Sequence, residues 1–157
     1  MIWRAVILLV LLPTLCLAQD FAGHQASTLD AVIEKWNGIT EAYKPGISVL
    51  QPQKIRFVAI LRAAPEPCSN APLEAVLRML GATDLLRQVS VTHCLVVSSA
   101  KGRAVTAFVQ DLLVPGLNSD AKPGHRVEIY ADFLAYVVDA DPSRNVPILL
   151  VSRFEPL

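Results

Sequence analysis

Residues 54–62, KIRFVAILR, carry apolar side chains at every second position. Successive side chains of a strand project to opposite faces, so Ile55, Phe57, Ala59 and Leu61 share one face. Arg56, Val58, Ile60 and Arg62 share the other face. This alternation predicts a strand that buries one face in a core and turns the other toward solvent.

A helix is expected before this strand. Between residues 29 and 43 apolar side chains recur at steps of three and four, which places them on one side of a helix. Ser27 and Thr28 offer N-cap oxygens, and the Lys-Pro-Gly sequence at residues 44–46 is a stop signal. The apolar positions are Leu29, Val32, Ile33, Trp36, Ile39 and Tyr43.

A second helix is expected after residues 64–67, which contain two prolines and are predicted to form a loop. Asn70 is a plausible N-cap, and Gly81 is a stop signal. One further helical turn is predicted at residues 83–87. The apolar stripe of the second helix consists of Leu73, Val76, Leu77 and Leu80.

From residue 89 onward the sequence is typical of short strands separated by turns. The first two runs predict a hairpin around residues 100–102. Residues 148–151 are apolar on both faces, so the last strand is expected to be central or covered by a helix. Residues 115–124 are rich in turn-forming residues and are expected to be irregular. The strand-like runs are residues 89–98, 103–110, 126–131, 133–138 and 147–154.

Two helices followed by a series of strands predict an α+β fold. The expected architecture is a small antiparallel sheet or an OB-like, partly open barrel of about five to six strands, with the two helices of the N-terminal half packed on it. A chain of 157 residues fits one domain, which we place at residues 19–157. Its polar start, residues 19–27, is expected to be a mobile leader.

Residues 1–18 have the composition of a signal peptide. Arg4 is followed by a continuous apolar run at residues 5–12, and Cys16-Leu17-Ala18 forms a small-x-small cleavage site. The run is shorter than the roughly 20 residues that a membrane-spanning helix needs. An uncleaved anchor and lipidation at Cys16 are the alternatives. We expect cleavage after Ala18 and a periplasmic or secreted protein.

Export determines how the cysteines are interpreted. Removal of Cys16 from the three cysteines leaves Cys68 and Cys94. An even pair in an oxidising compartment predicts a disulfide. His93 adjoins Cys94, but neighbouring strand residues point to opposite faces and cannot form a catalytic dyad.

Charge and motifs exclude several function classes. Cleavage of residues 1–18 removes Arg4 and leaves 13 basic and 14 acidic residues. The mature chain would therefore have no excess of positive charge to attract nucleic acid. No membrane association is expected after cleavage. The sequence has no phosphate-binding loop, nucleophile elbow or zinc-ligand spacing, so neither a cofactor nor a metal is expected.

Carboxylates offer the remaining catalytic candidates. Asp111, Glu128 and Asp132 could supply a pair for acid and base chemistry. Asp111 and Asp132 also end apolar runs, where acidic residues commonly form turns. Glu128 is expected to pair across the sheet with Arg126, Arg103 or Arg153.

Surface recognition is the function that the sequence favours. Arginine and tyrosine on one sheet face are common in contact patches, although an ordinary amphipathic face has the same composition. We expect a non-enzymatic binding or accessory domain for a protein or glycan of the envelope or extracellular space. The alternative is a small hydrolase or transferase with Asp or His groups in a helix-sheet cleft. The predicted binding surface comprises Arg103, Arg126, Tyr130, Tyr136 and Arg153.

Overall fold

The computed structural model describes residues 21–35, 45–141 and 146–157, and it confirms the α+β class. Phe21–Gly23 and Asp111–Leu113 form short 3-10 turns, η1 and η2. The helices are α1 (Leu29–Glu34), α2 (Ala71–Met79), α3 (Leu85–Gln88) and α4 (Val114–Asp120). The strands are β1 (Gln25–Ala26), β2 (Gly46–Leu61), β3 (Glu66–Pro67), β4 (His93–Ser98), β5 (Ala104–Val109), β6 (Arg126–Val138) and β7 (Val146–Pro156).

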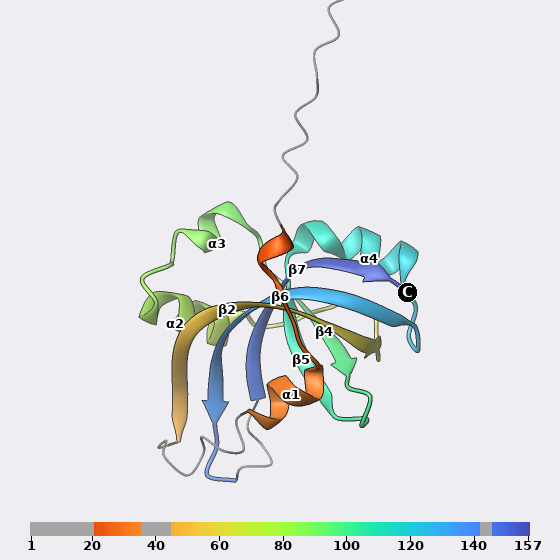
Figure 1. Ribbon diagram of the computed structural model, residues 1–157. Helices are drawn as coiled ribbons and strands as arrows, with labels where there is room; N and C mark the ends of the chain where they lie inside the picture. The colour runs from red at the N-terminus through yellow and green to blue at the C-terminus, as the bar shows by residue number, and fades with distance from the viewer. Residues whose placement is uncertain (1–20, 36–44, 142–145) are drawn as a thin grey trace, which may run out of the picture.

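All seven strands belong to one sheet, in the order β1-β2-β6-β7-β5-β4-β3. A further pairing joins the end of β2 to the end of β4, so the sheet curls into a partly closed ring (Figure 1). The pairs β1–β2 and β5–β7 are parallel, and the others are antiparallel. The sheet therefore has more strands than the five to six expected, because β1 and β3 add two-residue pairings at its ends.

The inner face of the ring forms the larger apolar core. The predicted face of β2 points inward, and Phe57 and Leu61 are fully buried there. Val127 and Ile129 of β6 and Leu149 and Val151 of β7 complete the same core. The alternation of β2 thus predicted its correct inward side.

A second apolar core lies on the outer face, under α2. Leu73, Val76 and Leu77 of the helix pack there with Ile148 and Leu150 of β7. Both faces of β7 are therefore covered, as its continuous apolar run predicted. In Figure 1, α2 and α3 lie together beside the curved sheet, where α2 covers this outer core.

The helices α1 and α4 contribute to the inner core from different sides of the ring (Figure 1). Thr28 caps α1 by accepting a hydrogen bond from the Ala31 backbone N–H, 3.0 Å long. Leu29, Val32 and Ile33 are buried as predicted. The predicted continuation of this helix, with Trp36, Ile39 and Tyr43, lies outside the described residues.

Three segments expected to be irregular contain regular structure. Within residues 115–124, Val114–Asp120 forms α4, because Pro115 occupies the first turn, where no amide donor is needed, and Leu117 is fully buried. The expected mobile leader contains η1 and β1, which pairs with β2 at Ile55 and Arg56. The loop at residues 64–67 contains β3, which pairs with β4.

Candidate functional site

The five residues of the predicted binding surface do not form one patch. Arg103 and Arg126 lie on the side of the ring near α1, where Arg103 is 4.0 Å from Glu34. Tyr130 and Arg153 are opposite each other on β6 and β7. Tyr136 is buried in the inner core, with only 1% of its surface exposed.

A shift of register explains the position of Tyr136. The pairing of β6 with β7 skips a residue between Phe133 and Ala135, which reverses the alternation of side chains. Phe133 and Tyr136 therefore both face inward, with their rings edge to face at 5.0 Å. The Tyr136 hydroxyl donates a hydrogen bond to the Val32 backbone oxygen, and burial raises its pKa.

Tyr130 points outward, but the N-terminal segment covers it. The rings of Phe21 and His24 lie 5.5 and 5.4 Å from the Tyr130 ring. The Arg153 guanidinium lies 4.7 Å from the centre of the Phe21 ring and pairs with Glu155. Tyr130 and Arg153 thus lie together, and Phe21 and His24 pack on Tyr130 rather than leaving it as a free surface.

A hollow of about 620 Å³ opens between α1, β2 and the β4–β5 turn. We call it the edge groove. Its walls are mainly apolar, and Val58 is exposed there despite its size. Lys101 on the turn pairs with Glu34 of α1 at 2.8 Å. The residues that line it include Leu29, Asp30, Val58, Ile60, Ser98 and Arg126.

Part of the β2 edge faces this groove without a partner strand among the described residues. Arg56 pairs with β1, and its backbone oxygen accepts from the Ser27 N–H, whereas Ile60 pairs with Ser98 of β4. Backbone groups two residues apart in a strand point to the same side. The N–H and C=O of Val58 therefore point into the gap between β1 and β4.

Two buried polar atoms at the groove also lack partners within the described residues. The Ser98 side chain is 1% exposed, and its hydroxyl makes no hydrogen bond. The Oδ1 atom of Asp30 has none either, while Oδ2 accepts from the Lys101 backbone N–H at 3.4 Å. Buried polar groups normally have hydrogen-bond partners. We infer that a molecule bound in the groove supplies the partners of these two atoms.

A second hollow, about 310 Å³, lies between α3 and the sheet. We call it the His24 cavity. His24 is 8% exposed, and its Nε2 has no hydrogen-bond partner in the described part of the chain. Asp132 and Lys54 face the same cavity from paired positions on β6 and β2. Burial raises the pKa of the Asp132 carboxyl, although Lys54 and His24 oppose the shift.

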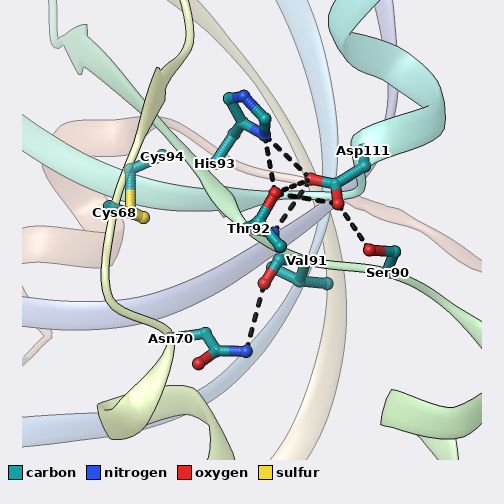
Figure 2. A network of polar contacts seen from close by, with 8 residues as sticks. All are labelled: Cys68, Asn70, Ser90, Val91, Thr92, His93, Cys94 and Asp111. Atoms are coloured by element: carbon teal, nitrogen blue, oxygen red, sulfur yellow. Dashed lines mark hydrogen bonds and ion pairs between the residues drawn. A yellow bond between two sulfur atoms is a disulfide. The ribbon is translucent and has the colours of Figure 1, made fainter.

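Asp111 is the centre of a polar network that the sequence did not indicate. Figure 2 shows its carboxylate beside Ser90, Thr92 and His93, and His93 Nδ1 lies 3.0 Å from Asp111 Oδ1. Ser90 and Thr92 donate hydroxyl hydrogen bonds to the carboxylate, and the Thr92 backbone N–H donates another at 2.9 Å. Burial would raise the pKa of Asp111, but these hydrogen bonds hold it well below its ordinary value.

The network ties the start of β4 to η2 rather than forming a catalytic triad. The Thr92 hydroxyl and the Asp111 carboxylate both lie at His93 Nδ1. No hydroxyl of the described residues is hydrogen-bonded to His93 Nε2, where a triad places its nucleophile. Glu128 pairs with Arg56 at 3.8 Å, not with any of the three arginines expected. Asp111, Glu128 and Asp132 thus have three different environments.

Cys68 and Cys94 lie at disulfide distance, with Cα atoms 5.7 Å apart, as predicted (Figure 2). The cross-link joins the loop before α2 to β4 beside the outer core. The Asn70 side chain donates a hydrogen bond to the Val91 backbone oxygen at 3.1 Å. This bond is a second link between the loop before α2 and the segment that leads into β4.

The chain matches no protein-family model, and no curated protein or solved structure is significantly similar to it. Among the described residues, no group of three or more His, Cys, Asp or Glu side chains is placed to hold a metal ion. No helix in the described ranges is long and apolar enough to cross a membrane.

Proposed function

We propose that the chain is an exported, non-enzymatic binding or accessory domain that recognises another protein of the envelope or extracellular space. The edge groove is the recognition site. One observation carries this proposal: among the described residues, a stretch of β2 without a partner strand lies in an apolar groove, beside the buried Ser98 hydroxyl, which has no hydrogen-bond partner there. The signal-like residues 1–18 and the Cys68–Cys94 pair support export, and no nucleic-acid or membrane partner is proposed.

An OB-like interpretation of the ring is part of the same proposal. It is supported by the strands β2, β4, β5, β7 and β6, which are joined around the ring by successive pairings. Barrels of this type bind ligands on one outer strand face and its adjoining loops. Here Cys94 and Phe108 on the outer face of β4 and β5 belong to the core under α2. The open part of that face is the end near Ser98, which borders the edge groove.

The groove favours an extended peptide segment as the partner's contact. Such a segment could pair its backbone with the N–H and C=O of Val58, as in β-strand addition. An apolar side chain would cover Val58 and Ile60, and the Asp30 Oδ1 atom would accept a hydrogen bond from the segment. From Arg56 to Ile60 the edge spans four residue steps, about 13 Å at the usual rise, which suits a short insertion.

The test uses a displayed library of random peptides selected on the purified protein. Val58→Pro removes the outward N–H but leaves the β2–β6 hydrogen bonds, and proline is tolerated at such an edge position. Val58→Thr keeps the N–H and the branched shape, so it is the matched control. We expect selected peptides to bind the native and Val58→Thr proteins and to lose affinity at least about tenfold for Val58→Pro.

NMR of the selected complexes locates the contact. Perturbed amide signals at Val58, Ile60 and Ser98 are expected. Selection of no peptide, or of peptides that bind Val58→Pro as well as the native protein, would show that the groove does not bind in this way.

The alternative function, a small hydrolase or transferase, is favoured by one observation. His24, Asp132 and Lys54 converge on a cavity between α3 and the sheet, which is the helix-sheet cleft expected for such an enzyme. The Ser152 hydroxyl at this cavity donates to the Tyr130 backbone oxygen at 3.2 Å, so it is not held against a base as an activated nucleophile would be. Turnover of ester, phosphate or glycoside substrates that Asp132→Asn abolishes and His125→Phe preserves would establish the enzyme instead.

A further inference from the structure

The His24 cavity has features of a ligand site that is separate from the edge groove. It lies between α3 and the β2–β6–β7 part of the sheet, and the N-terminal turn η1 contributes one of its walls. Neither the disulfide nor the Asp111 network lines it. Its volume of about 310 Å³ is at the lower end of the range for small-molecule pockets.

The orientation of the His24 ring determines what the cavity presents. The Nδ1 atom lies 3.3 Å from the Phe21 backbone oxygen, which can only accept a hydrogen bond. In the neutral imidazole Nδ1 therefore carries the proton, and Nε2 is an acceptor. Because Nε2 is buried without a partner in the described residues, it needs a donor from a molecule in the cavity.

A single water molecule would leave most of this space unfilled. A water occupies about 30 Å³ in the liquid, roughly a tenth of the cavity volume of 310 Å³. The occupant that fits is therefore larger than one water, and it carries more than one hydrogen-bond donor, since the Asp132 carboxylate also faces the cavity.

The charges at the cavity favour a neutral ligand. The Asp132 carboxylate is balanced by the Lys54 ammonium, which lies opposite it on the paired strand. The Lys54 ammonium would repel a cationic ligand, and the Asp132 carboxylate would repel an anionic one. A neutral molecule with several hydroxyl groups satisfies His24 and Asp132 as acceptors and accepts from Lys54.

The remaining lining residues divide into apolar and polar ones. Phe21, Leu85 and Val89 are apolar, and Gln88, Gln110 and Ser152 are polar. A pyranose ring has this same division, with hydroxyl groups at its edge and C–H groups on its faces. We propose that the His24 cavity binds one neutral sugar ring, with its hydroxyls at His24 and Asp132 and its C–H face against Phe21 and Leu85. This inference does not depend on the peptide-binding function of the edge groove.

The experiment is an NMR titration of isotope-labelled protein with glucose, galactose and N-acetylglucosamine, and separately with methylammonium chloride as a small cation. We expect saturable shifts with at least one of the three sugars, centred on His24 and Ser152. The Nε2 nitrogen signal of His24 should move in the direction of hydrogen-bond acceptance. The dissociation constant should lie in the millimolar range.

Two variants and one control assign the binding. His24→Phe keeps an aromatic ring in the contact with Phe21 and Tyr130 but removes Nε2, and it should weaken sugar binding about tenfold or more. His125→Phe changes an exposed histidine outside the cavity and should bind like the native protein. Asp132→Asn is a second variant within the cavity should His24→Phe fail to fold.

Three results would overturn the proposal. They are the absence of saturable shifts with all three sugars, shifts that persist undiminished in both cavity variants, and binding of methylammonium in place of the sugars. The peptide selection on the edge groove has a separate outcome, so failure of one proposal does not decide the other.

Discussion

Removal of the Cys68–Cys94 cross-link is expected to lower the free energy of unfolding substantially while the fold persists. The perturbation is the double substitution Cys68→Ala/Cys94→Ala. Alanine is preferred to serine because both cysteines pack against the outer apolar core, where a new hydroxyl would be buried.

The magnitude follows from the size of the closed loop. The cysteines are 26 residues apart in the sequence, and the chain-entropy relation gives about 3.5 kcal/mol at 25 °C for a loop of that length. A domain of this size changes its melting temperature by roughly 2–4 °C per kcal/mol, so a fall of about 10 °C is expected. The fold should survive because β3 still pairs with β4, and the Cys68 N–H still donates to the Thr92 backbone oxygen.

Thermal and denaturant unfolding of the native and double-alanine proteins, each with and without a phosphine reductant, measures the effect. Reductant should lower the melting temperature of the native protein toward that of the variant and leave the variant unchanged. A difference below about 2 °C between native and variant would contradict the reasoning, since it would mean that the unfolded chain gains little freedom. A reductant effect on the variant itself would show that the measured change has another origin.

Three further predictions follow from the same structure. Intact mass of the protein recovered from an export-competent host should correspond to residues 19–157, and a chain that begins at Met1 or carries lipid on Cys16 would contradict the signal assignment. Leu77→Ala and Ile129→Ala should each cost about 2–5 kcal/mol in denaturant unfolding, because both side chains are buried, whereas Glu34→Ala removes only an exposed ion pair and should cost about 1 kcal/mol or less. Asp111→Asn should destabilise by about 1–3 kcal/mol at pH 7. The folded pKa of Asp111 lies below its unfolded value, so this difference should shrink as the pH falls below about 4.

Local sequence patterns predicted the strands and helices whose side chains alternate or recur without interruption. The inward side of β2, the apolar stripe of α2 and the double burial of β7 all follow from spacing within one segment. Burial favours one register so strongly that a shift by one residue would expose the whole apolar set.

Features that depend on contacts between distant segments were not predictable in this way. The inward turn of Tyr136 results from a register shift against β7, and the helix α4 is stabilised by packing of Leu117 although its residues favour turns. The spacing of Val114, Leu117 and Ala121, all in contact with the inner core, was the available signal for that helix.

The candidate sites were even harder to predict from the sequence. The edge groove arises because β1 and β4 leave part of β2 unpaired, and the His24 cavity joins residues from the two ends of the domain. Neither has a motif of contiguous residues. The sequence predicted a sheet face that carries arginine and tyrosine, but not that Phe21 and His24 would cover Tyr130.

The pairing of β2 with β6 also determines how the chain reaches its fold. Gly46 pairs with Val138, and Ile60 pairs with Arg126, so the longest strand pair joins segments separated by most of the domain. The entropy of closing so long a loop is lost before these contacts form, and chains dominated by such pairings fold in milliseconds to seconds rather than microseconds. The hairpin of β4 and β5 and the helix α2 involve only near neighbours and can form early. We therefore expect the pairing of β2 with β6 to form slowly, and until it forms the apolar inner faces of both strands are exposed to solvent and to other chains.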